Sequence, residues 1–270
     1  MKEFVADKNR KLSKLCLYHI EDLSFSAFMK ALRKKDIKVN GKRVSQDIAL
    51  SVGDKVEIFY VKTHIEKYQT LYKDQNILVI NKFSGYTSEN VYDEIKKEYD
   101  GAGFIHRLDR NTSGIMVFSL NPVADTELLK GFKNRTFDKK YTAIVVGEMP
   151  KKEDVLTAYL VKDKESALVK IFDKKVQNSV MIKTGYKVLE VSKETSKLLI
   201  TLYTGKTHQI RAHLAHIGHP ILGDGKYGDF VINRKYNLTE QQLCATELTL
   251  RFEEESPLNY LNDKKFFIKG

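Results

Sequence analysis

FIHRLDRNTSG, residues 104–114, leads directly into IMVF (115–118), an apolar run that predicts a buried strand. A second polar stretch with apolar flanks, TGKTHQIRAHL (204–214), predicts the first turns of an amphipathic helix. Only nine of the 46 Lys and Arg residues are arginines, and three of the nine lie in these two stretches. A planar guanidinium suits two-point binding of a carboxylate or phosphate, although an arginine taken alone is as readily part of a surface ion pair. The two stretches are therefore the candidate functional site.

Strand-like runs with few helices between them make up the chain around these stretches. The runs are ILVINK (77–82), TAIVV (142–146), VLTAYL (155–160), ALVKIF (167–172) and KLLITLY (197–203). Helical patterns occupy residues 90–99 and a segment that Asn121 caps and Pro122 opens, with Ala124, Leu128 and Phe132 inward. So many strands with so few helices between them predict an α+β fold with a mixed, mostly antiparallel sheet rather than a doubly wound parallel one.

The first 60 residues are basic for their length, in a chain of formal net charge +11. An N-terminal helix is predicted at Leu12–His19, and Ser24 is expected to cap a second in which Phe25, Phe28, Met29 and Leu32 face inward. Asn40-Gly41 predicts a tight hairpin, and a Gly53-Asp54 turn precedes the strand-like KVEIFY (55–60). The resulting basic patch carries seven cations: Lys30, Arg33, Lys34, Lys35, Lys38, Lys42 and Arg43. Such a patch favours a polyanionic partner, although most charge runs are simply solvated.

Several function classes are excluded by motifs that fail. Gly101 and Gly103 begin a dinucleotide fingerprint, but His106 stands in place of its third glycine. Gly205-Lys206-Thr207 ends like a phosphate loop, but Ile200 replaces the first glycine of that motif. No apolar run reaches the length of a membrane span, and the N-terminus lacks the apolar segment of a secretory signal. Together with only two cysteines, far apart, these features predict a cytoplasmic protein that binds no membrane.

Four of the seven histidines fall within HQIRAHLAHIGH (208–219). His213 and His216 could share one helix face, as in a metal site, but the segment has no cysteine or carboxylate, and the first acid after it is Asp224. We therefore expect no metal, and histidines that pack in the fold or face the polyanionic partner.

Residues 11–60 resemble the S4 RNA-binding module, in which a basic helix is followed by VNGK, here residues 39–42, and then by a GD turn. The resemblance implies docking on structured RNA through shape and phosphate contacts. It divides the chain into an S4-like domain, residues 1–61, and a catalytic domain, residues 69–270, joined by a polar linker at 61–68.

The larger part resembles the RluA-type pseudouridine synthases, and the whole chain resembles the RluC/RluD-like members with an S4 module. The resemblance rests on HRLDRNTSG (106–114), Lys139-Lys140-Tyr141, TGKTHQIRAHLAHIGHPILGD (204–224) and LCATELTL (243–250). It implies a cofactor-free isomerase that converts uridine to pseudouridine in RNA, with large-subunit ribosomal RNA favoured and transfer RNA as the alternative. No obligate protein partner is implied, and we expect a monomer.

The resemblance also assigns roles to residues. Asp109 is implied to be the catalytic aspartate, Arg211 the arginine that pairs with it, Tyr141 the tyrosine beneath the base, and Arg107 the side chain that replaces the flipped uridine in the RNA. A nearby guanidinium stabilises a charged carboxylate and fixes its orientation, and a stacked base must be extruded before it can reach a buried group. Further substrate-binding residues are implied at His106, Arg110, Thr112, Lys139, His208, Gln209 and Leu243.

The sequence departs from the family pattern at three places. Lys82 is followed by Phe83 rather than proline, Lys206 replaces an arginine, and Cys244 replaces a histidine. These departures leave the subfamily and the target uridine open. Two other classes also remain: an RNA-binding protein on an inactive enzyme scaffold, against which Asp109, Tyr141 and Arg211 argue together, and a metal-dependent RNA hydrolase that uses the histidines.

Overall fold

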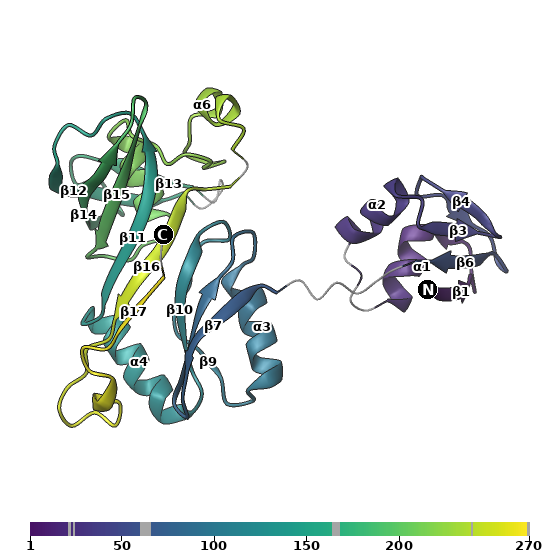
Figure 1. Cartoon of the computed structure of the whole chain (residues 1–270), viewed down its shortest axis with the longest axis horizontal. Coiled ribbons are helices and arrows are strands. Elements are labelled where there is room, and N and C mark those ends of the chain that lie inside the picture. The colour runs from purple at the N-terminus through teal and green to yellow at the C-terminus, as the bar shows by residue number, and fades with distance from the viewer. Residues whose placement is uncertain (21–22, 24, 60–65, 164–167, 239, 269–270) are drawn as a thin grey trace. The chain divides into compact units, whose positions relative to one another are not determined.

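The chain divides into two compact units, Met1–Ile65 and Glu66–Gly270, in a computed structural model (Figure 1). The structure describes residues 1–20, 23, 25–59, 66–163, 168–238 and 240–268. The predicted Ser24 cap and most of the predicted linker lie outside these residues. Tyr68, expected in the linker, is already the first residue of a strand.

The first unit combines two helices with short strands. Its elements are β1 (Lys2–Val5), β2 (Arg10–Lys11), α1 (Leu12–His19), α2 (Phe25–Arg33), β3 (Ile37–Val39), β4 (Lys42–Val44), β5 (Ala49–Leu50) and β6 (Lys55–Ile58). Four strands form a sheet in the order β1-β6-β3-β4, and β2 pairs with β5. The predicted hairpin is confirmed, since β3 and β4 pair across Asn40 and Gly41, which both have the positive φ of a tight hairpin turn.

One side chain of this unit was predicted on the wrong side of its helix. Phe25 is 57% exposed, because α2 buries Phe28, Ala31 and Leu32 instead. His19, the last residue of α1, is exposed as well, and its ring stacks on Phe4 of the unpredicted strand β1. The helices themselves are confirmed.

The second unit is built on an eleven-stranded sheet. Its helices are α3 (Ser88–Glu98), α4 (Pro122–Asn134), α5 (Gln209–His216), α6 (Phe230–Lys235) and the 3-10 turn η1 (Asn259–Leu261). Its strands are β7 (Tyr68–Lys73), β8 (Ile77–Lys82), β9 (Gly103–Phe104), β10 (Ser113–Ser119), β11 (Asp138–Val146), β12 (Glu153–Lys162), β13 (Val169–Phe172), β14 (Val180–Val191), β15 (Thr195–Leu202), β16 (Leu243–Thr249) and β17 (Lys265–Phe267).

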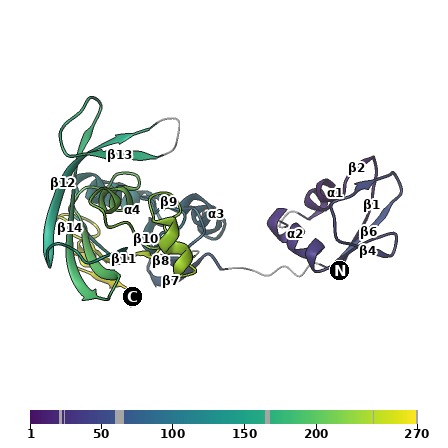
Figure 2. The ribbon, with the colours of Figure 1, turned by 90° about the horizontal axis from the view of Figure 1, so that it is seen from above.

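The sheet is mixed and almost wholly antiparallel, as predicted. Its order is β13-β12-β14-β15-β11-β16-β10-β8-β7, with β9 on β10 and β17 on β16. Figures 1 and 2 show β12 and β14 toward one end of this unit and β7 and β8 toward the other. Among the strands that the structure describes, only β10 and β16 pair in parallel, at Ser113 and Gly114. Gly114 has φ +119°, and a Cβ there would lie 2.4 Å or less from the backbone of Ala245, so this crossing requires glycine.

The strands β8 and β10 are buried on both faces, which explains why their sequences are continuous apolar runs. Leu78 and Ile80 pack on one face with α3, whereas Ile77 and Val79 pack on the other with α4. The helices form where predicted: Asn121 caps α4, and α3 begins at Ser88, two residues early, because Thr87 accepts a hydrogen bond from the amide of Asn90. None of the helices described is long and apolar enough to cross a membrane.

Candidate active site

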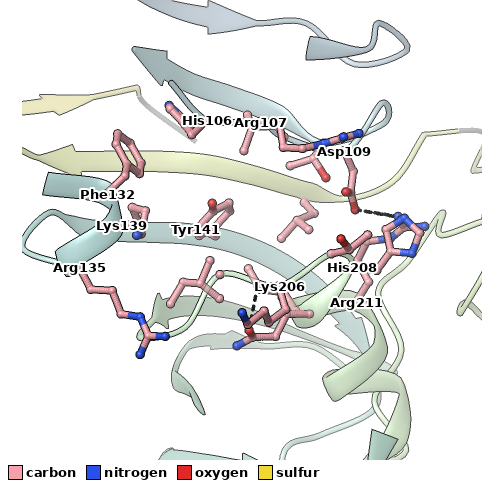
Figure 3. Close-up of a pocket in the computed structure, with 18 of the residues that line it drawn as sticks. His106, Arg107, Asp109, Phe132, Arg135, Lys139, Tyr141, Lys206, His208 and Arg211 are labelled. Carbon is pink, nitrogen blue, oxygen red and sulfur yellow. Dashed lines mark hydrogen bonds and ion pairs between the residues drawn. The ribbon is translucent and has the colours of Figure 1, made fainter. Parts of the chain in front are cut away.

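A cavity of about 550 Å³ lies between the two stretches that the sequence singled out (Figure 3). Its walls come from the loop between β9 and β10, the C-terminal part of α4, β11, and the segment that enters α5. Ten of the eleven predicted catalytic and substrate-binding residues line it: His106, Arg107, Asp109, Thr112, Lys139, Tyr141, His208, Gln209, Arg211 and Leu243. Asp109 is the only carboxylate among the described residues of this lining.

The eleventh, Arg110, does not line the cavity. Its Nε donates to the carbonyl of Gly85, 2.9 Å away, so the exposed side chain links the loop that carries Asp109 to the loop after β8. The resemblance places Arg110 among the substrate-binding residues, and its side chain leaves the cavity because consecutive residues of an extended loop point to different sides.

The loop that carries Asp109 is fixed by buried polar groups on both sides. Ser88 Oγ accepts from the amide of Leu108 and donates to its carbonyl, both at 2.9 Å. The fully buried Lys82 donates its three protons to the carbonyls of Phe83, Tyr86 and Arg110, at 2.9–3.1 Å. Burial lowers the pKa of Lys82 to about 8, with a smaller opposing effect from Asp109.

Arg211 joins the two predicted stretches and a third segment. Its NH1 donates to Asp109 Oδ2 at 2.8 Å, while its Nε and NH2 form a two-point pair with Asp224 at 2.7 and 2.8 Å. Asp224 is fully buried and also accepts from the amides of Lys226 and Tyr227. Burial alone would raise the pKa of Asp224, but Arg211 and these amides outweigh it and hold the pKa below its usual value. Asp224 thus fixes the guanidinium that positions Asp109.

Tyr141 lies in the cavity between its two ends (Figure 3). It is 8% exposed, and burial, followed by the charge of Asp109, raises its pKa above the usual value. The ring is therefore a neutral, flat surface near the carboxylate.

His208 is close to Asp109 but is held by another residue. Its Nε2 is 4.0 Å from Asp109 Oδ2, and its Nδ1 is 3.0 Å from the hydroxyl of Tyr227, which also accepts from the amide of Val169. His208 has φ +53°, a conformation that is rare outside glycine and costs free energy. Tyr227 was not predicted, because no local pattern connects it to position 208.

Gln209 and Thr112 were predicted to bind substrate, but the fold itself uses their polar atoms. Gln209 accepts from the hydroxyl of Thr204 and the amide of Lys206, and donates to Thr184 and to the carbonyl of Lys183. Thr112 is 3% exposed and its hydroxyl accepts from Gln241. Both residues shape the cavity rather than offer it a polar group.

The remaining predicted residues differ in exposure. Arg107 is exposed and pairs with Glu89 at 3.2 Å. His106 is half-buried, accepts from the amide of Val117 through Nε2, and stacks on Phe132. Leu243 is buried at the cavity wall. Sequence reasoning missed the cavity residues Phe132, Lys133, Arg135 and Lys206 as site residues, because they are spread over a helix end and a turn.

The histidine side chains of residues 208–219 contact separate partners and do not converge on one point. His213 is paired with Thr184, His216 with Asp173, and His219 with the carbonyl of Val146. Within the part of the chain that the structure describes, no three His, Cys, Asp or Glu side chains come together in a metal-binding group.

The burial of His213 predicts that the folded chain loses stability at acid pH. Its exposed fraction is 1%, and burial lowers its pKa to about 4, with a smaller effect from His216. Since the unfolded chain binds this proton from about pH 6.5 downward and the folded chain does not, His213 should cost about 2 kcal/mol of stability at pH 5 relative to pH 8. Urea unfolding of His213→Gln should show a pH dependence flatter by that amount, and His216→Gln serves as the control. Equal pH slopes in wild type and His213→Gln would contradict it.

Known proteins resemble this chain in sequence and fold. A family model described as RNA pseudouridylate synthase matches residues 67–216. A Vibrio vulnificus protein named ribosomal large subunit pseudouridine synthase C is 30% identical over 236 residues, 78% of this chain and 74% of that protein. A Rickettsia conorii protein of the same name is 31% identical, covering 85% and 86%. The solved structure of human RNA pseudouridylate synthase domain containing 1 superposes with a TM-score of 0.63 at 25% identity, covering 73% of this chain and 83% of that one.

Proposed function

Because this chain belongs to the RNA pseudouridylate synthase family, we propose that it isomerises uridine to pseudouridine in large-subunit ribosomal RNA with Asp109, Arg211 and Tyr141 as its reacting site. One observation carries the assignment of residues. The only carboxylate in the described cavity lining is held by a buried guanidinium and faces the same space as Tyr141. The ribosomal substrate is supported by the names of the relatives in Vibrio and Rickettsia.

The reaction moves one bond and exchanges one proton. The bond from the ribose C1′ to N1 of uracil breaks, the base turns, a bond from C1′ to C5 forms, the C5 proton is lost and N1 gains a proton. Asp109 acts at the sugar or at the base, oriented by Arg211, and no redox step or cofactor is required. Tyr141 gives the detached uracil a flat surface to turn on.

Extrusion of the uridine precedes this chemistry. A stacked base cannot reach Asp109, which is 22% exposed at the cavity wall, so the nucleotide has to leave the RNA stack. Arg107 lies at the cavity rim with an exposed side chain, two residues from Asp109, and fills the vacated space. Its ion pair with Glu89 is exposed, so breaking the pair costs little free energy.

The proposed substrate is tested with tritiated RNA. Purified protein is mixed with large-subunit ribosomal RNA transcripts that carry tritium at uridine C5, and with a transfer RNA pool labelled in the same way. We expect release of label to water from the ribosomal transcript, at one position when the product is mapped. Release from transfer RNA alone would make transfer RNA, rather than ribosomal RNA, the substrate. Release from neither RNA would overturn the proposed function. Activity undiminished by chelator would exclude the metal-dependent hydrolase.

We also propose that the first unit is an S4-like module that holds this RNA. Six cations of its basic patch are exposed, and Lys38 is half-buried against the ring of Phe59. None of the seven forms an ion pair with a described residue, so their charge is available to phosphates. The cytoplasmic location and monomeric state expected from the sequence stay predictions.

The RNA-binding role of the basic patch predicts a change in salt dependence. Replacing Lys34, Lys35 and Lys38 by glutamine should weaken RNA binding and reduce the slope of log affinity against log salt by about 2, since each lost phosphate contact removes about 0.7–0.9. Binding is measured by filter retention from 50 to 300 mM salt. Replacement of Lys8, Lys11 and Lys14, exposed lysines of the same unit, is the control. An unchanged slope would mean that the patch does not contact phosphate.

A further inference from the structure

The cavity has a positively charged end away from Asp109. Figure 3 shows Phe132, Lys139 and Arg135 gathered there, with Tyr141 between them and the carboxylate. Lys133 and Lys206 also line the cavity. None of these four cations forms an ion pair with any residue that the structure describes. The charge of this end is therefore unbalanced within the protein.

Arg135 occupies a backbone position that is unfavourable for arginine. It ends α4 in the left-handed conformation, with φ +60° and ψ +35°, and its amide closes the helix by bonding to the carbonyls of Gly131 and Phe132. Glycine or asparagine adopts this position at lower cost. The Arg135 guanidinium makes no hydrogen bond to the described chain and is exposed at the cavity. A side chain that costs stability and has no partner in the protein indicates a ligand.

Lys139 is aimed at the same place by packing. Its ammonium lies 5.3 Å from the centre of the Phe132 ring, and that ring stacks on His106 at 4.4 Å. Burial lowers the pKa of Lys139, and the charge of Arg135 lowers it further. The two cations thus repel each other, and the adjacent Asp138, which pairs with Arg251, gives only partial compensation. An anion placed between them would relieve both the repulsion and the desolvation.

We propose that Arg135 and Lys139 bind a backbone phosphodiester of the RNA, next to the uridine whose base enters the cavity. The inference rests on the proposed function and adds to it a point that fixes the strand relative to Asp109. A phosphodiester carries one negative charge and two acceptor oxygens, which suits a guanidinium and an ammonium together. A base held at Tyr141 and a phosphate held at Arg135 would leave the ribose C1′ in a defined place, which positioning of the reacting carbon requires.

The experiment uses short synthetic RNAs that contain the mapped uridine, with the 5′ or the 3′ phosphate of that nucleotide replaced in turn by a neutral methylphosphonate. Single-turnover tritium release at increasing protein concentration gives a half-saturating concentration and a maximal rate. For the double variant Arg135→Gln, Lys139→Gln, we expect a half-saturating concentration at least about tenfold higher on unmodified RNA, in line with loss of charge-assisted hydrogen bonds. A variant with Arg135→Lys in place of Arg135→Gln keeps the charge at position 135 and should recover part of the lost RNA binding.

The deciding comparison is whether the protein substitutions and the neutral RNA linkages have coupled or additive effects on binding. One of the two neutral linkages should weaken binding of wild type about as much as the double variant does, and should add little when combined with it. Lys140→Gln is the matched control, because Lys140 is the next residue of β11 but pairs with Glu247 and does not line the cavity. An unchanged half-saturating concentration in the double variant, or additive effects at both phosphates, would overturn the proposal. Failure of wild type on unmodified RNA would instead overturn the proposed function.

Discussion

Asp109→Asn is expected to abolish isomerisation, with a loss of about 10⁴-fold or more in the single-turnover rate, as for other enzymes that lose a catalytic carboxylate. The substitution removes a negative charge and a nucleophilic oxygen but hardly changes the shape of the side chain. Arg211 keeps its two-point pair with Asp224, and the loop keeps its bonds to Ser88 and Lys82. The fold should therefore persist, and the loss is chemical rather than structural.

Tritium release from ribosomal RNA measures this loss, and filter retention measures RNA binding in parallel. Binding should change less than about threefold, because Asp109 is one negative charge among the cations of the cavity and does not attract the RNA. Asp173→Asn, which removes an exposed carboxylate of the same unit, is the control and should keep full activity. A decrease in rate of less than tenfold for Asp109→Asn would remove Asp109 from the catalytic role.

Asp224→Ala is expected to lower the free energy of unfolding by about 3–5 kcal/mol, the cost of removing one partner from a buried ion pair. Arg211 is 6% exposed and would keep a single carboxylate partner at the cavity wall. The amides of Lys226 and Tyr227 would lose their acceptor as well. Isomerisation should fall too, because the guanidinium that orients Asp109 is no longer fixed.

Urea unfolding followed by circular dichroism suits this measurement, since the chain has no tryptophan. A double-mutant cycle separates the ion pair from the loss of packing. Asp224→Leu combined with Arg211→Met removes both charges and should be less destabilised than the sum of the single variants. It should also be inactive. Additive destabilisation, or an Asp224→Ala protein as stable as wild type, would show that Asp224 does not anchor Arg211.

Much of the larger unit could be predicted because its signals are local. Asn121 and Pro122 set the start of α4, and the apolar runs gave the strands and the mixed sheet. The meeting of Asp109 and Arg211 across 102 positions came from the family resemblance, and the structure shows the contact. Asp224 was noted only as the first acid after the histidine-rich segment, because no periodic pattern says which carboxylate of a loop will pair with a buried arginine.

Other parts of the site depend on packing that no short segment encodes. The side of the loop on which Arg110 lies is set by its bond to Gly85, and the cavity end at Arg135 exists only because α4 stops beside β11. In the same way, strand β1 is a short exposed segment whose place depends on pairing with β6, 50 residues away. Tertiary pairing, rather than propensity, decides such elements.

The internal hydrogen bonds of Lys82, Ser88 and Gln209 bear on how the activity of related sequences is inferred. The hydrogen bonds that these side chains make within the described residues are all internal, so a relative that did not isomerise uridine would still need them in order to fold. Asp109, by contrast, contributes one bond at a cavity wall and could be lost without unfolding the chain. With the role proposed for Asp109, a homologue that retains these hydrogen-bonding residues and lacks the carboxylate would fold without isomerising uridine, and position 109, rather than overall similarity, would distinguish the two.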